Sequence, residues 1–96
     1  MTTPLEVDVC EGCGRALFPA RALCPGCGGR VFRREAAGPG VVEEVTARVL
    51  ADGSSVAIAS VRLAKGPVVI ARSPGDAPPG AEVELLDDGG APVVSA

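Results

Sequence analysis

The sequence contains no histidine, no tyrosine and no tryptophan, and phenylalanine occurs only twice. Histidine is the most common general base in enzymes, and tyrosine is a frequent proton donor, so the usual groups for proton transfer are missing. The four cysteines lie within residues 10–29, and no free thiol remains as a nucleophile if all four bind a metal. We therefore expect that this chain catalyses no reaction on its own.

Long apolar runs are also absent. No stretch of 18 apolar residues is present, so the sequence predicts no membrane span. The first residues lack a basic segment followed by an apolar one, which argues against a secretory signal. A cytoplasmic protein is expected, and closely paired cysteines in a reducing compartment more often bind metal than form disulfides.

The scarcity of aromatic residues and the net charge of −3 both argue against nucleic-acid binding. Proteins that bind single strands usually stack bases on aromatic rings and follow phosphates with a basic groove. Only residues 1–37 carry a slight positive excess, five arginines against four acids. A nucleic-acid-binding module is therefore the alternative that the composition supports less well.

The cysteines form the pattern C-x2-C-x10-C-x2-C, made by Cys10, Cys13, Cys24 and Cys27. Two intervening residues let one tight turn direct both sulfur atoms at one ion, and two such turns complete a tetrahedral site for zinc. A single iron ion or an iron–sulfur cluster is the alternative occupant, because spacing alone does not select the metal. Four thiolates leave no open position for water or substrate, so we expect a structural Zn²⁺ site.

Beyond the segment GPG at residue 38, the sequence changes to short apolar stretches separated by turn residues. We predict five strands, over residues 41–50, 55–63, 68–72, 81–86 and 92–95. In the first of these, Val41, Val45, Ala47 and Val49 are expected on one face, and Glu43 breaks the alternation. The proline-rich residues 73–80 are expected to form a loop.

The predicted fold class is mainly β, with a rubredoxin-like zinc ribbon over residues 1–37 followed by a small five-stranded OB-fold barrel over residues 38–96. A closed barrel removes exposed sheet edges, which favours it over an open sandwich, the alternative architecture. The core buries little apolar surface, since its apolar residues are mostly valine, alanine and leucine. We therefore expect a chain this small to be stabilised by covalent cross-links or a bound metal.

Three motifs resemble a known family, the zinc-ribbon plus OB-fold proteins of domain of unknown function thirty-five, which are acyl-CoA-associated partners of thiolases. CEGCGRALFPARALCPGC resembles the ribbon of that family, with Ala20 in place of its second proline. GPGVVEEVT is similar to the start of its barrel, and APPGAEVELL to a late turn and strand. The resemblance covers residues 10–95. Members usually carry an N-terminal helical segment and several barrel aromatics, whereas nine residues precede Cys10 here and Glu43 and Val45 occupy positions that are often aromatic.

The resemblance implies a noncatalytic accessory or scaffold subunit of a thiolase-superfamily acyl-CoA enzyme, in a hetero-oligomer. It also implies a contribution to the binding of a CoA thioester. On this basis Arg21, Arg33 and Arg34 are candidate contacts for CoA phosphates, since guanidinium groups make charge-assisted hydrogen bonds to phosphate oxygens.

Overall fold

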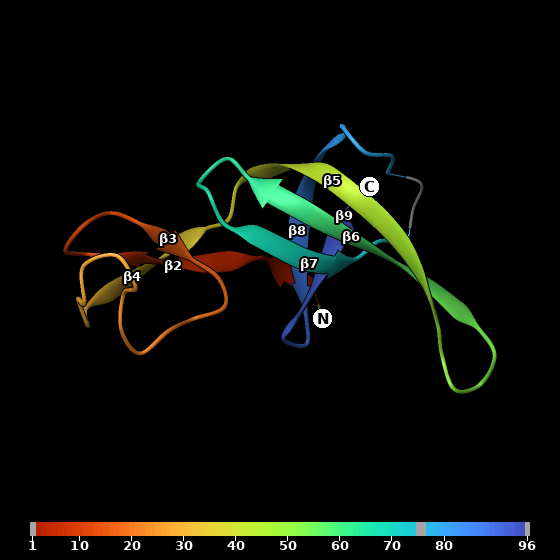
Figure 1. The fold of residues 1–96 in the computed structure, drawn as a ribbon, viewed down its shortest axis with the longest axis horizontal. Helices are drawn as coiled ribbons and strands as arrows, with labels where there is room; N and C mark the ends of the chain where they lie inside the picture. Colours follow the sequence, from red (N-terminus) through yellow and green to blue (C-terminus); the bar gives the residue numbers. More distant parts are fainter. Residues whose placement is uncertain (1, 75–76, 96) are drawn as a thin grey trace.

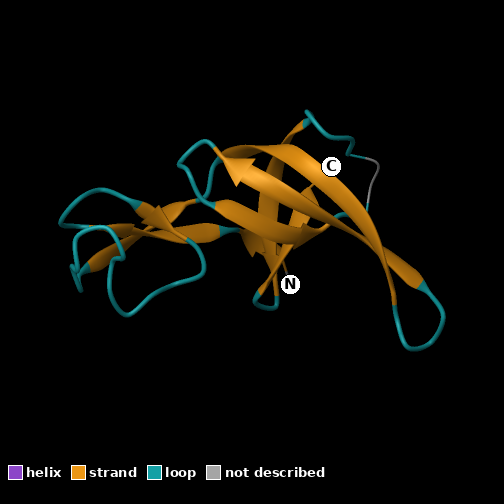
Figure 2. Cartoon of the chain, viewed as in Figure 1, coloured by secondary structure: helices purple, strands orange, loops and turns teal. Residues whose placement is uncertain are grey.

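The computed structural model describes residues 2–74 and 77–95, and these residues form strands, turns and loops (Figure 2). The prediction of a mainly β protein is confirmed. None of the described residues belongs to a helix long and apolar enough to cross a membrane. Residues 75 and 76 of the predicted loop, together with the two terminal residues, lie outside the described part.

The second part of the chain is a closed barrel of five strands, as predicted. They are β5 (Pro39–Val49), β6 (Ser55–Leu63), β7 (Val68–Arg72), β8 (Glu82–Asp88) and β9 (Ala91–Ser95). Their order around the barrel is β5-β6-β7-β9-β8, and β8 pairs with β5 to close it. The contact between β7 and β9 is parallel and all the other pairings are antiparallel. This closed order agrees with an OB barrel and excludes the open sandwich.

The first part of the chain contains four strands that the sequence did not predict. β1 (Thr2–Pro4) adds to the edge of the barrel by pairing with β8, while β2 (Glu6–Cys10) lies between β3 (Ala16–Leu17) and β4 (Phe32–Ala36). The three-stranded ribbon occupies one end of the elongated molecule, and the hairpin of β5 and β6 projects from the other (Figure 1). The principal extents are 44 × 28 × 24 Å.

A single buried cluster joins the ribbon to the barrel. Leu5, Val7 and Val9 pack in the same core as the barrel residues Val61 and Val83. Burial of apolar surface is the main favourable term in folding, so the two parts stabilise each other. The predicted division into residues 1–37 and 38–96 stays a prediction. β1 pairs with the barrel strand β8, and the buried cluster contains residues from both sides of the predicted boundary.

The prediction that Val41 shares a face of the first barrel strand with Val45, Ala47 and Val49 was wrong. The register of β5 against β6 shifts between Val42 and Glu44, which marks a β-bulge. A bulge inserts one residue and reverses the alternation of faces. Val42 is therefore buried with its partner Val61, and Val41 is 43% exposed. The irregularity at Glu43 was visible in the sequence, but its effect on Val41 was not predicted.

Candidate metal centre

Two equivalent turns position the four cysteines. In the first, the N–H of Gly14 donates to the carbonyl of Cys10 at 2.8 Å, and in the second the N–H of Gly28 donates to the carbonyl of Cys24 at 2.8 Å. Gly14 and Gly28 have φ angles of 78° and 76°, in the left-handed region that glycine adopts at little cost. The repeated C-x-x-C-G motif therefore produces the same turn twice, and the two turns face each other.

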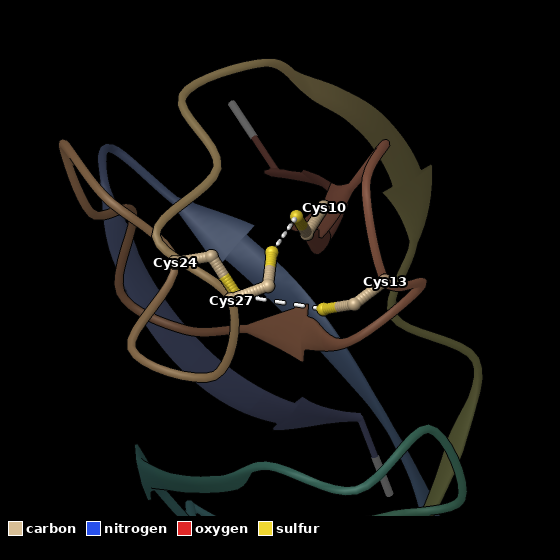
Figure 3. A group of neighbouring side chains, drawn as sticks. All are labelled: Cys10, Cys13, Cys24 and Cys27. Carbon is tan, nitrogen blue, oxygen red and sulfur yellow. Dashed lines mark hydrogen bonds between the residues drawn. The ribbon is translucent and has the colours of Figure 1, made fainter.

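The turns bring the four sulfur atoms together (Figure 3). All four Sγ atoms lie within 4.8 Å of one another, with 3.5 Å between those of Cys10 and Cys27 and 3.6 Å between those of Cys13 and Cys24. Four sulfurs at the usual zinc–sulfur distance of about 2.3 Å would be separated by roughly 3.8 Å. The arrangement therefore fits a tetrahedral ion.

Because glycine has no side chain, glycines beside the cysteines leave room for the sulfur atoms. A Cβ atom at Gly29 would lie 3.1 Å from the Sγ of Cys10 and 3.3 Å from that of Cys27. The backbone N–H of Gly12 donates to the Sγ of Cys10 at 3.3 Å. Backbone donors of this kind stabilise thiolates in metal sites, so the surroundings suit charged sulfur.

The thiols influence one another's ionisation. The backbone of Cys27 is the main hydrogen-bonding group that lowers the pKa of the Cys24 thiol, to about 6. The Gly29 backbone lowers the pKa of the Cys27 thiol, but hydrogen bonds with Cys10 and Cys13, together with burial, outweigh this effect and raise the pKa to about 12. Four thiolates this close repel one another. A bound cation is therefore needed to keep all of them ionised.

A guanidinium group covers the second turn. A Cβ atom at Gly26 would lie 3.0 Å from the Nε of Arg15, so the Arg15 side chain packs directly on this turn. Four thiolates on Zn²⁺ carry a formal charge of −2, and an arginine beside them offsets part of that charge. The absence of a side chain at Gly26 makes this approach possible.

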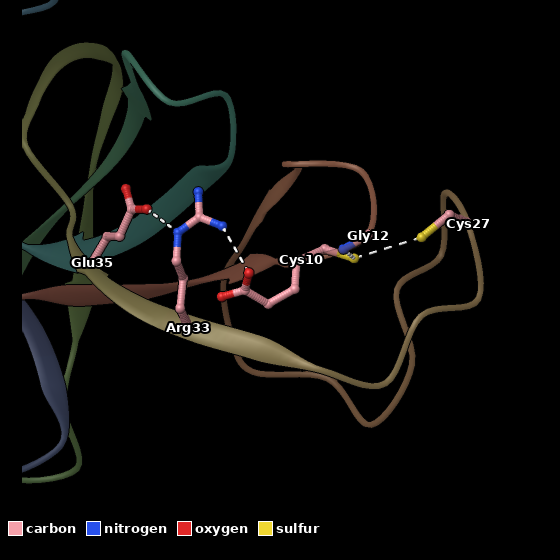
Figure 4. A network of polar contacts seen from close by, with 6 residues as sticks. Cys10, Gly12, Cys27, Arg33 and Glu35 are labelled. Atoms are coloured by element: carbon pink, nitrogen blue, oxygen red, sulfur yellow. Dashed lines mark hydrogen bonds and ion pairs between the residues drawn. The ribbon is translucent and has the colours of Figure 1, made fainter.

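The three arginines named as candidate phosphate contacts do not form one cluster. Arg33 is paired with Glu35 and lies 3.6 Å from Glu11 (Figure 4). These acids, Glu35 first, raise the pKa of Arg33. Arg34 lies 3.4 Å from Asp8 and 3.7 Å from Glu6.

Arg21, by contrast, lines a cleft between the ribbon and the barrel, together with Arg15 and Lys65. Arg15 and Lys65 were not predicted as phosphate contacts, because the packing of the turn between β6 and β7 against the ribbon leaves no local pattern in the sequence.

A closed four-cysteine centre on a ribbon, followed by a five-stranded barrel, defines the class of zinc-ribbon plus OB-fold proteins. Residues 5–33 match the family model described as the ChsH2 rubredoxin-like zinc ribbon domain. A solved chain of the Ltp2-ChsH2(DUF35) aldolase is similar to this chain, with a TM-score of 0.71 and 23% sequence identity. The match covers 95% of this chain and 81% of that chain.

No curated protein sequence matches this chain. The family model supports the predicted resemblance over the ribbon, and the shared fold extends the likeness through the barrel.

Proposed function

We propose that the chain is a noncatalytic accessory subunit of a cytoplasmic, thiolase-superfamily acyl-CoA enzyme, and that its metal is a structural zinc ion held by Cys10, Cys13, Cys24 and Cys27. The observation that carries this proposal is the closed four-sulfur centre in a fold shared with a chain of the Ltp2-ChsH2(DUF35) aldolase. Zinc at this centre supplies folding energy, because the sulfurs occupy every coordination position.

The residue content supports a noncatalytic role. The chain has no histidine or tyrosine, and its only thiols are the four of the metal centre. A general base or nucleophile would therefore have to come from a partner. The resemblance to thiolase partners supplies the class of that partner, and with it the acyl-CoA substrate.

The hairpin of β5 and β6 is the surface that we assign to the partner enzyme. It projects from the end of the molecule opposite the ribbon (Figure 1), and it exposes Val45, Val49 and Leu50 at 39%, 74% and 45%. Within residues 2–74 and 77–95, β5 pairs with β8 only over Pro39–Val41, so the rest of its outer edge has no neighbouring strand. Val45 and Val49 share one face of β5, and an apolar surface beside a free edge is suited to burial against another subunit.

The experiment that tests the proposal is a native pull-down of the full chain, with mass spectrometry of its partners and metal analysis of the eluate. Co-elution with a thiolase-type enzyme at a fixed ratio, with one zinc ion per chain, is the expected result. Elution of the zinc-loaded chain alone, or with nucleic acid, would overturn the functional assignment and leave the zinc ribbon intact.

Val49→Lys is expected to weaken association with the enzyme by about tenfold or more, which corresponds to roughly 1.4 kcal/mol. The reason is that the substitution places a hydrated charge in the buried interface. Thr46→Lys is the matched control, because Thr46 lies on the opposite face of the same strand. The measurement is the dissociation constant of the purified complex. Equal binding by wild type and Val49→Lys would contradict the assignment of the hairpin.

A further inference from the structure

The outer edge of β5 is open over most of the hairpin that it forms with β6. β8 pairs with β5 only over Pro39–Val41, and Val42 makes the next backbone bonds on this side. In the part of the chain that the structure describes, no strand adjoins residues 43–49 along this edge. Free edges of this length are usually blocked by proline, lysine or a bulge. Residues 44–49, with the sequence EVTARV, contain neither proline nor lysine, and the bulge comes before them.

The distal part of this hairpin has only two strands. β7 pairs with β6 as far as Ile58, which lies opposite Thr46, and beyond this point the hairpin projects from the barrel (Figure 1). A ribbon of two strands is only marginally stable in water unless a further strand joins it. A third strand on the free edge of β5 would therefore stabilise the hairpin.

The direction of the backbone groups on this edge follows from the register of the hairpin. The N–H of Leu50 donates to the carbonyl of Ser54 on the β6 side. Backbone groups of successive residues point to opposite sides of a strand, so Thr46 also directs its N–H and carbonyl toward β6. Val45 and Ala47 direct theirs toward the free edge. The edge therefore presents donors and acceptors at the spacing of an antiparallel ladder.

The charges along this edge are self-complementary. Glu44 and Arg48 lie two residues before and two residues after Thr46, on the same face of β5. Both are exposed, and neither forms an ion pair with another described residue. Four residues of strand separate them by about 13 Å, which is too far for them to pair with each other. A second copy of the strand, running in the opposite direction, would place Glu44 beside Arg48.

We propose that two copies of this chain associate by antiparallel pairing of their β5 edges, about a twofold axis at Thr46. In this register Glu44 of each copy lies opposite Arg48 of the other, and Val45 lies opposite Ala47. The pairs of Val45 with Ala47 are hydrogen-bonded, so the pairs of Glu44 with Arg48 are of the non-hydrogen-bonded kind, in which side chains approach most closely. A twofold axis at either neighbouring residue places no opposite charges face to face.

The test is sedimentation velocity of the zinc-loaded full chain at low ionic strength, where ion pairs are least screened. Two short edges bury less surface than a standard interface, so we expect a dissociation constant on the order of tens of μM and a measurement over about 5–500 μM. Glu44→Arg and Arg48→Glu should each weaken self-association about tenfold or more, because each places like charges opposite one another. Arg30→Glu is the matched control, since it makes the same change of charge on an exposed residue of the ribbon.

An equimolar mixture of Glu44→Arg and Arg48→Glu tests the register itself. Each variant is expected to be monomeric alone and the mixture dimeric, because two arginines of one copy then lie opposite two glutamates of the other. This rescue also shows that neither variant failed to fold. A mixture no more associated than its components would overturn the proposal, as would a wild-type chain that stays monomeric at every concentration. In the latter case the edge remains available for a strand of the partner enzyme.

Self-association and enzyme binding can be measured separately. All apolar side chains of the hairpin stay on one face of the joined sheet, where the proposed function places the enzyme. Thr46→Lys leaves these side chains unchanged but places two ammonium groups at the twofold axis, so it should prevent self-association. Val49→Lys should preserve it, because residue 49 lies opposite Glu43 in the proposed register. Failure of the dimer therefore gives a different result from failure of the proposed function.

Discussion

Cys24→Ser is expected to abolish zinc binding at this centre and to unfold residues 10–29, whereas the barrel strands keep their pairing. Loss of one thiolate opens the coordination sphere, and structural zinc contributes on the order of 10 kcal/mol to the folding of small zinc domains. Cys24 is 2% exposed and belongs to the turn closed by Gly28. The measurement is amide hydrogen exchange along the chain, combined with metal analysis.

Arg30→Gln is the control for this variant, because Arg30 is an exposed ribbon residue and is not one of the four cysteines. It should retain one zinc ion per chain and the exchange protection of the ribbon. Chelation of zinc from the wild-type chain should reproduce the effect of Cys24→Ser. A ribbon that stays protected after complete removal of the metal would refute a structural role for zinc.

Gly40→Ala is expected to destabilise the barrel. Gly40 pairs with Leu63 on β6 and with Val83 on β8. A Cβ atom at this position would lie 2.6 Å from the Cγ1 of Val61 and 3.0 Å from the carbonyl oxygen of Arg62. Overpacking of this kind costs about 1–3 kcal/mol, so the melting temperature should fall by roughly 5–20 °C.

The neighbouring residue provides the control for Gly40→Ala. Val41 is 43% exposed and faces away from the core, so Val41→Ala should change stability by no more than about 0.5 kcal/mol. Thermal unfolding followed by circular dichroism at constant zinc concentration distinguishes the two variants. Similar melting temperatures for Gly40→Ala and wild type would show that β5 and β6 separate easily, contrary to the tight contact between Gly40 and Val61.

The barrel was the most predictable part of the fold. Its strands alternate or run apolar for five to eleven residues and end at glycine and proline, so local patterns define them. β6 and β7 have the predicted bounds, and the pattern C-x2-C-x10-C-x2-C predicted the cluster of sulfur atoms. Both predictions depend on information carried by neighbouring residues in the sequence.

The ribbon strands were missed because their environment decides their structure. β2 alternates only briefly, and β4 is rich in charge, with the sequence FRREA. Its arginines become compatible with a strand because acids on β2 and β4 pair with them, as in the contact between Arg34 and Asp8. Cross-strand charge pairs of this kind arise only once the register is fixed.

The cleft between the ribbon and the barrel could not be predicted from the sequence, for a related reason. Arg21 was predicted to act with Arg33 and Arg34, which lie on the same segment of chain. The structure instead places Arg21 with Lys65, because the core that joins ribbon and barrel sets which surfaces face each other. The bulge in β5 had the same effect on Val41, whose exposure depends on how the partner strand is aligned.

The parallel contact between β7 and β9 is the seam of the barrel. One residue pair, Arg72 with Val93, joins these strands, whereas β9 also pairs with β8 at five positions. If the seam opens, the cylinder becomes a curved sheet that keeps all of its antiparallel pairings. β9 then stays attached to the barrel through β8 alone. Transient opening of the barrel therefore exposes its interior on the β7 side first.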